Sequence, residues 1–454
     1  MINTLYLPEL REMLGRRDEP ALREFCTALH PARTAEFMEG LSASEAWLVI
    51  GYADAALREE IFGYFGHDRQ SEIIETQELE GIAQLVADLA PDDRVDVLDD
   101  VNPGRVHQLL ELLPADERHD ILRLRLYPDG SAGAVMTTEI AKLSESLTVT
   151  DALTELGTQA EQLETIYYLY VVDATDHLRG VVSTRQLVSA MGRPETRLGE
   201  LMETDVVAVN PMDDQEDVAR QVARYDLLAI PVVDRERVMV GIITHDDVID
   251  VVREEATEDA HRSAAVAPLD TSYLKTHVLT LGWKRGIWLT ILFAAAILTA
   301  GALEFYSDKL AKWEWLVWFI PLVISCGGNS GSQSATLVVT ALATGDITLS
   351  DWGRVLWREV LQGLLLGVFL AVIGYVAVSL IQPVSTDVLP FSVFVVPVTV
   401  LLVVVSGTVL GALLPLVFQR LGLDPALMSN PFVAGIIDIL GIVVYMSVAQ
   451  WLLS

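Results

Sequence analysis

One carboxylate lies inside an otherwise apolar stretch near the end of the chain, in SNPFVAGIIDILG, residues 429–441. An ionised carboxylate at bilayer depth costs about 2.5–3.5 kcal/mol on insertion scales, so Asp438 needs an explanation. In one interpretation, Asp438 accepts a hydrogen bond between helices or is simply protonated. In the other, it faces water and binds a cation. Pro431 lacks an N–H, so oxygen groups are exposed about two turns before Asp438. The small residues Ala434 and Gly435, one turn before Asp438, leave room for a hydrated ion. We favour the cation site.

A second polar stretch, ISCGGNSGSQSAT at residues 324–336, lies within another apolar segment. Its glycines, its hydroxyl residues and the amides Asn329 and Gln333 would form an unusual surface against lipid. Small residues let helices approach closely and polar side chains can line a watery path, so the stretch serves packing, an ion path or both. Asp438 is the only acid deep in any apolar segment, because Glu359 and Asp424 lie near the expected cytoplasmic ends.

The formal net charge of −32 lies almost entirely in residues 1–280, which carry −30. An acidic half joined to a nearly neutral apolar half is typical of a membrane protein with a large water-facing part. The acidity argues against nucleic acid and anionic lipid as partners, and it favours cations unless it serves only solubility. Asp92 and Asp96 stand at helical spacing, where like charges destabilise a helix by about 0.2–0.5 kcal/mol per pair. A bridging divalent cation would reverse this repulsion; the alternative is a solvated acidic face.

No combination of residues typical of a catalytic site stands out, and we predict that the protein is not an enzyme. Its histidines are scattered among charged helical segments. Cys26 and Cys326 lie in different halves of the chain, so no disulfide framework is expected, as suits a cytoplasmic domain. Residues 1–20 lack an apolar core, so we expect no signal peptide.

The acidic part begins with short helices in a repeat of about twelve residues. LAPDDRVDVLDD, VNPGRVHQLLEL and LPADERHDILRL follow one another over residues 89–124, and each carries a Pro that suits the first turn of a helix. One such helix cannot bury its apolar face alone, so we predict an α-superhelical domain at 1–130, with a simple helical bundle as the alternative.

An internal repeat of a different kind follows, with a constant offset of 61 residues. Asp173 matches Asp234 and Gly180 matches Gly241, and each copy has an apolar strand, a polar turn, a Gly-containing strand and a helix entry. The tandem resembles a pair of CBS domains, so we predict an α/β CBS pair at 131–255.

A charged helical segment, DVVREEATEDAHRS at 250–263, leads toward the apolar part. We predict a linking helix at 256–282 and a transmembrane domain at 283–454. Each of five apolar segments is long enough to cross a hydrocarbon core of about 30 Å. The expected spans are 286–306, 315–343, 355–381, 391–418 and 427–453.

The distribution of basic residues predicts the orientation of these spans in a cell (inner) membrane. With residues 1–280 inside, the basic residues beside inner ends outnumber Lys309 and Lys312 in the outer loops. The inner ones are Lys284, Arg285, Arg354, Arg358 and Arg420. We therefore predict a cytoplasmic N-terminus and, with five spans, an external C-terminus.

GGNSGSQSAT, DPALMSNPFVAGIIDILG and the order of parts along nearly the whole chain resemble the MgtE family of magnesium channels. The resemblance implies a homodimer with its pore on the two-fold axis and Asp438 as the selectivity carboxylate from each subunit. It also implies that Asn430 and the Ala434 carbonyl help to hold a hydrated ion, with Asn329 and Gln333 along the pathway. Mg²⁺ dehydrates reluctantly and usually keeps several waters, which agrees with so few protein ligands.

The resemblance further implies uptake of Mg²⁺ down its electrochemical gradient, and closure of the pore when cytosolic Mg²⁺ binds the acidic domains. The implied ligands are acidic residues of the soluble part and of the inner mouth. They are Asp92, Asp96, Asp214, Glu216, Asp226, Asp247, Asp250, Glu255, Glu258, Asp259 and Asp424. Ions that prefer the closed state populate it, which gives negative feedback.

CBS pairs also bind adenine nucleotides, and a pocket would involve Tyr168, Arg185, Thr244 and Asp247. Gln186 and Leu227 replace the acidic and aromatic residues expected there, which weakens the expectation of ATP as a ligand. Two further functions remain open: an ion-coupled divalent-cation carrier or exporter in which Asp438 cycles through protonation, and a nucleotide-sensing membrane protein.

Overall fold

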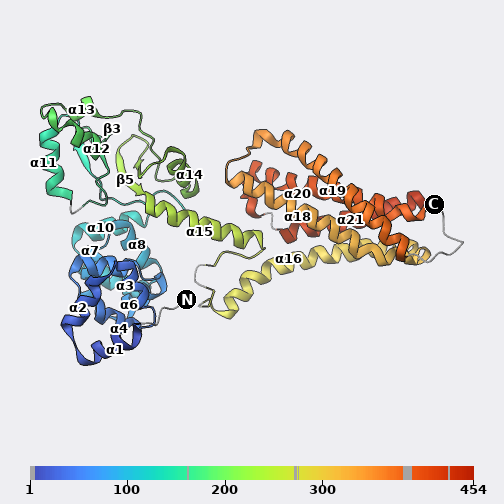
Figure 1. Ribbon diagram of the computed structural model, residues 1–454, viewed down its shortest axis with the longest axis horizontal. Coiled ribbons are helices and arrows are strands. Elements are labelled where there is room, and N and C mark those ends of the chain that lie inside the picture. The colour runs from blue at the N-terminus through green and yellow to red at the C-terminus, as the bar shows by residue number, and fades with distance from the viewer. Residues whose placement is uncertain are drawn as a thin grey trace. The chain divides into compact units, whose positions relative to one another are not determined.

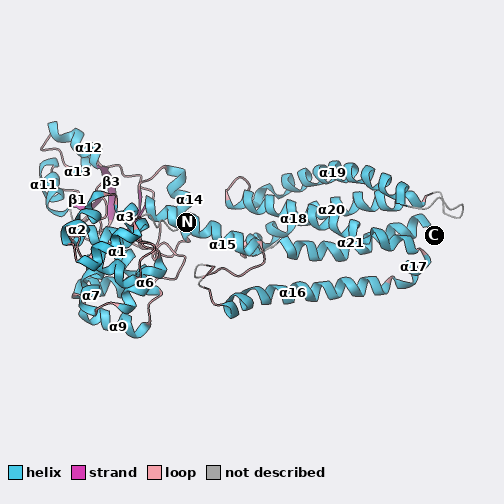
Figure 2. Cartoon of the chain, turned by 60° about the horizontal axis from the view of Figure 1, so that its bottom comes forward, coloured by secondary structure: helices cyan, strands magenta, loops and turns pink. Residues whose placement is uncertain are grey.

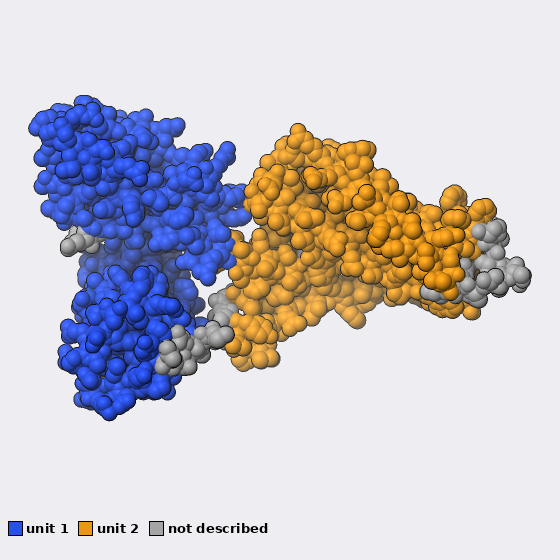
Figure 3. Space-filling model, in the orientation of Figure 1, with its two compact units in different colours: residues 1–253 blue, residues 254–454 orange. Residues whose placement is uncertain are grey.

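The computed structural model describes residues 6–160, 163–269, 273–274, 276–381, 391–427 and 430–453. Short helices and small sheets make up the first part of the chain, and long helices make up the second (Figures 1 and 2). The chain divides into two compact units, unit 1 at residues 1–253 and unit 2 at 254–454 (Figure 3). Each unit is described by itself.

Unit 1 begins with ten short helices. They are α1 (Leu7–Arg16), α2 (Glu19–Ala28), α3 (Pro31–Phe37), α4 (Ala43–Ile50), α5 (Ala55–Gly63), α6 (His67–Thr76), α7 (Leu79–Asp88), α8 (Pro91–Asp99), α9 (Pro103–Leu112) and α10 (Ala115–Leu124). From α3 onward, each helix packs on the one two positions further along. That pattern is typical of a superhelical array, and it confirms the helical domain. Pro occupies the first turn of α8 and α9, as the repeat predicts.

The CBS pair follows. Its strands are β1 (Lys142–Ser144), β2 (Tyr168–Val172), β3 (Leu178–Ser183), β4 (Ala229–Val233) and β5 (Met239–Thr244), and its helices are α11 (Val149–Gln159), α12 (Thr184–Ser189), α13 (Leu198–Leu201) and α14 (Gln215–Tyr225). The first sheet has the order β1-β2-β3, and β4 pairs antiparallel with β5.

The matched glycines of the repeat have the same role in both CBS domains. A Cβ at Gly180 would lie 2.7 Å from the Met202 sulfur, and one at Gly241 would lie 2.6 Å from the Met136 sulfur. Each glycine therefore leaves space for a methionine-bearing segment that pairs with its strand through an antiparallel bridge. The offset seen in the sequence reflects two copies of the same packing.

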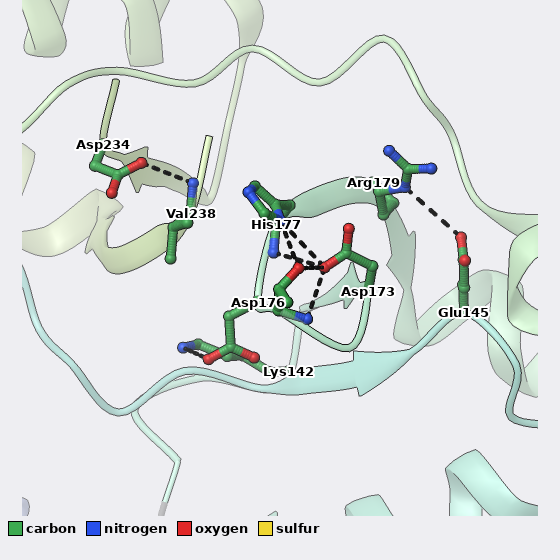
Figure 4. A network of polar contacts seen from close by, with 9 residues as sticks. Lys142, Glu145, Asp173, Asp176, His177, Arg179, Asp234 and Val238 are labelled. Carbon is green, nitrogen blue, oxygen red and sulfur yellow. Dashed lines mark hydrogen bonds and ion pairs between the residues drawn. The ribbon is translucent and has the colours of Figure 1, made fainter. Parts of the chain in front are cut away.

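The tips of the two hairpins join the CBS domains to each other (Figure 4). Leu178 N donates to Arg237 O at 2.9 Å, and Met239 N donates to Asp176 O at 3.0 Å. The matched aspartates shape the tips, since Asp234 Oδ1 accepts from Val238 N at 2.8 Å. Asp173 accepts the hydroxyl and amide of Thr175, and these bonds lower the pKa of its carboxyl well below the usual range.

Helix α15 runs over His245–Ser263 as one element. Its end is set by Ala265, which has a φ of 57°, and by Val266 N, which donates to His261 O at 2.9 Å. The predicted linking segment, 256–282, therefore contains the end of one helix and the start of another, and its bounds stay a prediction. The helix that leaves the CBS part ends at Ser263, and the next helix begins at Val278.

Unit 2 consists of long helices with short turns. They are α16 (Val278–Phe305), α17 (Ser307–Lys312), η3 (Glu314–Phe319), α18 (Ile320–Ala343), η4 (Leu349–Asp351), α19 (Trp352–Ile381), η5 (Ser392–Phe394), α20 (Val395–Arg420), η6 (Pro425–Leu427) and α21 (Asn430–Leu453). Among the described residues, α16, α19, α20 and α21 are long and apolar enough to cross a membrane. Helix α18 has 24 residues, but its polar stretch lowers its hydropathy. The count of five spans stays a prediction.

Helix α18 packs closely on α20 and α21. A Cβ at Gly411 would lie 2.1 Å from the Gly331 carbonyl oxygen, and one at Gly407 would lie 2.7 Å from the Gly327 carbonyl oxygen. On its other neighbour, a Cβ at Gly331 would meet Ile437 Cδ1 at 2.0 Å. Only glycine permits this approach of one backbone to another.

This packing makes a testable prediction. Gly411→Ala drives a methyl group into the α18 backbone, so we expect overpacking to destabilise unit 2 by about 1–3 kcal/mol. Thermal unfolding of the purified full-length protein in detergent measures the effect as a lower melting temperature. Gly301→Ala is the matched control, because nothing lies within 4 Å of the added carbon. Equal melting temperatures for the two variants would contradict the packing argument.

Candidate functional site

Asp438 lies on α21, half-buried, against the glycine-rich face of α18. A Cβ at Gly328 would lie 3.5 Å from Asp438 Oδ1 and 3.4 Å from the Ala434 Cβ. In the described part of the chain, no side chain donates a hydrogen bond to Asp438 and no cation pairs with it. The structure therefore offers no support for Asp438 as a hydrogen-bond acceptor between helices of one chain.

Asn430, at the start of α21, is held by two hydroxyl groups of α18. Ser332 Oγ donates to the Asn430 backbone oxygen at 3.0 Å, and Thr336 Oγ1 donates to Asn430 Oδ1 at 3.0 Å. Helix α18 thus contacts α21 both at Asn430 and, two turns further, at Asp438. The sequence singled out the hydroxyl-rich stretch but not these two partners of Asn430.

The two amides of α18 lie on an exposed face. Asn329, Gln333 and Thr336 are all exposed, at spacings of four and three residues that place them along one stripe. Asn329 Nδ2 donates to Ser325 Oγ at 3.2 Å. An exposed polar stripe on a helix inside a membrane protein requires water or another protein surface rather than lipid.

Glu359 is a buried acid that the sequence did not identify as a site. It belongs to α19 and is only 8% exposed. Its position near the end of an apolar segment suggested a carboxylate close to solvent. Only the packing of three helices reveals that it lies inside the protein.

Acidic residues also gather where unit 2 begins. The Arg262 guanidinium contacts the carboxylates of both Glu258 and Asp424. Burial raises the pKa of the neighbouring Asp259 carboxyl, and the negative charges of Asp424 and Glu255 raise it further. The structure therefore brings together the predicted ligands at the end of α15 and the predicted ligand at the inner mouth.

In unit 1, Asp92 on α8 approaches the start of α15. Asp92 is 8% exposed, and its Oδ1 has no hydrogen-bond partner within the described part of the chain. Burial raises the pKa of this carboxyl well above its usual value, and the charges of Asp247, Asp93 and Glu164 add to the shift. Burial also raises the pKa of Asp247 to about 6, against the opposing hydrogen bonds from Thr244.

Glu59 on α5 joins the same region and was missed in the sequence. Burial, followed by the charges of Asp88 and Asp93, raises its pKa to about 7.

The two acids at helical spacing on α8 differ in burial. Asp96 is exposed while Asp92 is buried, so the two carboxylates do not share one environment as the spacing suggested. Burial of a single helix position depends on partners far along the chain, which the spacing of acids does not encode.

The remaining predicted ligands are more dispersed. Asp214 caps the start of α14 by accepting from Glu216 N at 2.8 Å, whereas Asp226 lies at the other end of that helix with a φ of 50°. Asp250 pairs with Arg253 at 3.4 Å. Over the described ranges, no three His, Cys, Asp or Glu side chains form a group that could hold a metal ion. Mg²⁺ that keeps its waters does not need such a cage.

The predicted nucleotide residues fall into two pairs. Thr244 N donates to Asp247 Oδ2 at 3.2 Å in the second CBS domain, and Tyr168 pairs with Ser183 just before Arg185 in the first. Gln186 has a structural role, because its Oε1 accepts from Ser183 N at 2.7 Å.

Comparisons with known proteins agree with this architecture. A family model described as a divalent cation transporter matches residues 320–448, the model of the MgtE intracellular N domain matches 29–130, and the CBS domain model matches 132–193 and 198–254. The magnesium transporter MgtE of Thermus thermophilus is 38% identical over 448 residues, which cover 98% of each chain.

Two solved structures resemble the soluble part. The soluble part of a magnesium transporter is 33% identical with a TM-score of 0.52, and it covers 55% of this chain and 97% of that chain. The cytosolic domain of the Mg²⁺ channel MgtE in complex with ATP is 36% identical with a TM-score of 0.51, and it covers 53% of this chain and 98% of that chain. With a relative that matches along its full length and family models for each part, this chain belongs to the MgtE family of membrane magnesium transporters, which are not enzymes.

Proposed function

We propose that the protein is a homodimeric, Mg²⁺-selective channel that mediates uptake down the electrochemical gradient and is closed by cytosolic Mg²⁺. The observation that carries the proposal is the exposed polar stripe of α18, Asn329 and Gln333, on the helix that contacts Asp438 through Gly328. A second copy of the chain facing this stripe would enclose a water-filled path lined by two copies of Asp438. Two carboxylates balance the charge of one Mg²⁺, and its retained waters contact the remaining oxygens.

Closure by Mg²⁺ follows from the crowding of carboxylates. Asp92 is buried with an unpartnered oxygen near Asp247, and Glu258, Asp259 and Asp424 converge around Arg262. Two unit charges 4 Å apart interact by about 4 kcal/mol at an effective dielectric of 20, so a few unneutralised pairs oppose a compact state. Divalent ions between them favour that state, and a ligand that prefers one state shifts the population toward it.

Several finer features belong to the same proposal. The N-terminus is cytoplasmic, five helices cross the membrane, and the C-terminus is external. The other predicted ligands contribute to Mg²⁺ sensing; they are Asp96, Asp214, Glu216, Asp226, Asp250 and Glu255. The domain boundaries lie near 130, 255 and 282, and they separate the helical domain, the CBS pair, the linking segment and the transmembrane domain.

ATP is a second candidate ligand of the soluble part. A related cytosolic domain, 36% identical, has been solved in complex with ATP. Tyr168, Arg185, Thr244 and Asp247 are the residues proposed to contact it here. The proton-coupled carrier remains the alternative mechanism, and strict dependence of Mg²⁺ flux on a proton gradient would favour it over the channel.

The role of Asp438 is tested by one isosteric substitution. Asp438→Asn keeps the shape but removes both charges from the path of a dimer, so we expect loss of Mg²⁺ flux in reconstituted vesicles while the protein still folds. Asp308→Asn, in the exposed helix α17, is the control and should transport as the parent does. Undiminished flux through a folded Asp438→Asn protein would refute the assignment.

Gating is tested by neutralising three carboxylates together. A channel with Asp247, Asp250 and Asp259 changed to Asn loses repulsion but also loses ligands. We expect currents that persist at millimolar internal Mg²⁺, because no bridging ion can stabilise the closed state. Monovalent salt at equal ionic strength is the control, since it screens charge without bridging carboxylates. A channel that stays shut at both low and high internal Mg²⁺ would show that repulsion alone holds it open.

Acidification should weaken the closure. The raised pKa values, about 6 for Asp247 and about 7 for Glu59, mean that protons bind these groups between pH 8 and pH 6 and compete with Mg²⁺. We expect the internal Mg²⁺ concentration for half-closure to rise on going from pH 8 to pH 6, by about twofold for each ligand that is half-protonated.

Without Mg²⁺, protonation of the same carboxyl groups should stabilise the folded protein as the pH falls. A carboxyl whose folded pKa is raised binds more protons in the folded state, so the Mg²⁺-free protein becomes more stable as the pH falls from 8 toward 5. Melting temperatures with and without Mg²⁺ across this range provide the measurement. A Mg²⁺ requirement that does not change with pH would argue against these carboxylates as the sensor.

A further inference from the structure

Glu359 forms a polar junction between three helices of unit 2. Its Oε2 accepts from Ser334 Oγ of α18 at 2.6 Å, and its backbone oxygen accepts from Thr408 Oγ1 of α20 at 3.1 Å. Ser334 is 4% exposed and Thr408 is 2% exposed, so the whole junction is shielded from solvent. One residue of α19 thereby links α19 to both α18 and α20.

The junction lies beside apolar side chains. Val338 and Leu342 of α18 form a cluster with Ala412 and Leu416 of α20, and Val355, one turn before Glu359, packs against it. Within the described part of the chain, no Lys, Arg or His lies within ion-pair distance of the Glu359 carboxylate. Burial of a carboxyl group without a cation partner is costly, so its retention here points to a role other than stability.

Helix α18 meets α20 in two ways. Near the end of α18, Val338 and Leu342 pack on Ala412 and Leu416. In the middle of α18, Gly327 and Gly331 lie against Gly407 and Gly411, where backbone meets backbone. Glycines permit close approach but do not interlock as larger side chains do. A short, directional hydrogen bond to an ionisable group, such as that from Ser334 to Glu359, fixes both the rotation and the axial position of a helix.

The position of α18 determines the geometry beside Asp438. Ser334 lies between Ser332 and Thr336, the two residues whose hydroxyls hold the oxygens of Asn430. Gly328, less than two turns away, faces Asp438, since a Cβ added there would lie 3.5 Å from Asp438 Oδ1. A rotation or slide of α18 would therefore move Asn430 and the surface that faces Asp438 together.

We propose that Glu359 is a positioning residue for the ion path: through Ser334 it holds α18 in the register that places Asn430 and Gly328 beside Asp438. The inference rests on the proposed path at Asp438. It assigns the Glu359 carboxylate the role of a hydrogen-bond acceptor and not that of an ion ligand.

The test uses three single variants and the Ser334→Ala/Glu359→Ala double variant of the full-length protein in reconstituted vesicles, with flux normalised to folded dimer or monomer. Ser334→Ala removes the donor, Glu359→Ala removes the acceptor, and Glu359→Gln keeps an acceptor oxygen without the charge. Ser379→Ala is the matched control, because its hydroxyl donates to Tyr375 O within α19. The readouts are the Mg²⁺ concentration that gives half-maximal flux and the ratio of Mg²⁺ to Mn²⁺ flux.

We expect Ser334→Ala and Glu359→Ala each to raise the half-maximal Mg²⁺ concentration or lower the flux by about tenfold, and to lower the Mg²⁺ to Mn²⁺ ratio. The double variant should be no worse than either single one, because both remove the same bond. Glu359→Gln and Ser379→Ala should match the parent. A loss of folded protein alone would change the amount of flux but not the ratio between ions.

Two results would overturn the proposal. Parental flux and ion ratio in Ser334→Ala would show that the bond does not position α18, and this variant decides the matter even if Glu359→Ala does not fold. Loss of flux in Glu359→Gln as complete as in Glu359→Ala would show that the charge itself is required. Asp438→Asn is measured in parallel, because it tests the proposed ion path separately. Parental flux in Asp438→Asn would reject the path at Asp438, whereas parental flux in Ser334→Ala would reject only the positioning role of Glu359.

Discussion

The approach of the α18 backbone to α20 and α21 is the constraint on which the rest of unit 2 depends. Gly331 lies so close to Gly411 and Ile437 that a single added carbon would come within 2.1 Å of a neighbour on either side. With α18 held at this distance, its remaining faces can reach other helices through short side chains. Hydroxyl groups therefore suffice to bridge α18 to α19 at Glu359 and to α21 at Asn430.

The same closeness explains why the polar groups of α18 divide into two kinds. Ser334 points into the protein, where its hydroxyl is satisfied by a carboxylate, while Asn329 and Gln333 remain exposed in the single chain. Buried polar groups need partners within the chain, and exposed ones inside a membrane protein need water or a second copy. The structure of one chain thus already separates the residues that hold the helix from those that remain exposed and available to the proposed ion path.

Local patterns in the sequence were sufficient to predict the order of the domains and much of the fold of each one. The helical repeat carries its own prolines, and the CBS repeat carries Gly180 and Gly241, whose space is used in the same way in both copies. Burial was not predictable, because it depends on segments far apart in the chain: Asp92 is buried and Asp96 is not, and Glu359 lies inside a helix junction. The end of α15 was also missed, since Ala265 adopts a positive φ that its residue type does not favour.

Charge balance connects the soluble acids to the membrane part. Around the end of α15, Arg262 contacts two carboxylates, Glu258 and Asp424, and the carboxylates of Asp259 and Glu255 lie nearby. One positive charge therefore faces four negative ones, and negative charge remains in excess. Arg262 holds the carboxylates of Glu258 and Asp424 close in the absence of an ion. Burial is the main cause of the raised pKa of Asp259, and the charges of Asp424 and Glu255 raise it further. Under the proposed gating, a divalent ion bound here would remove the remaining repulsion at a site whose carboxylates Arg262 already holds together.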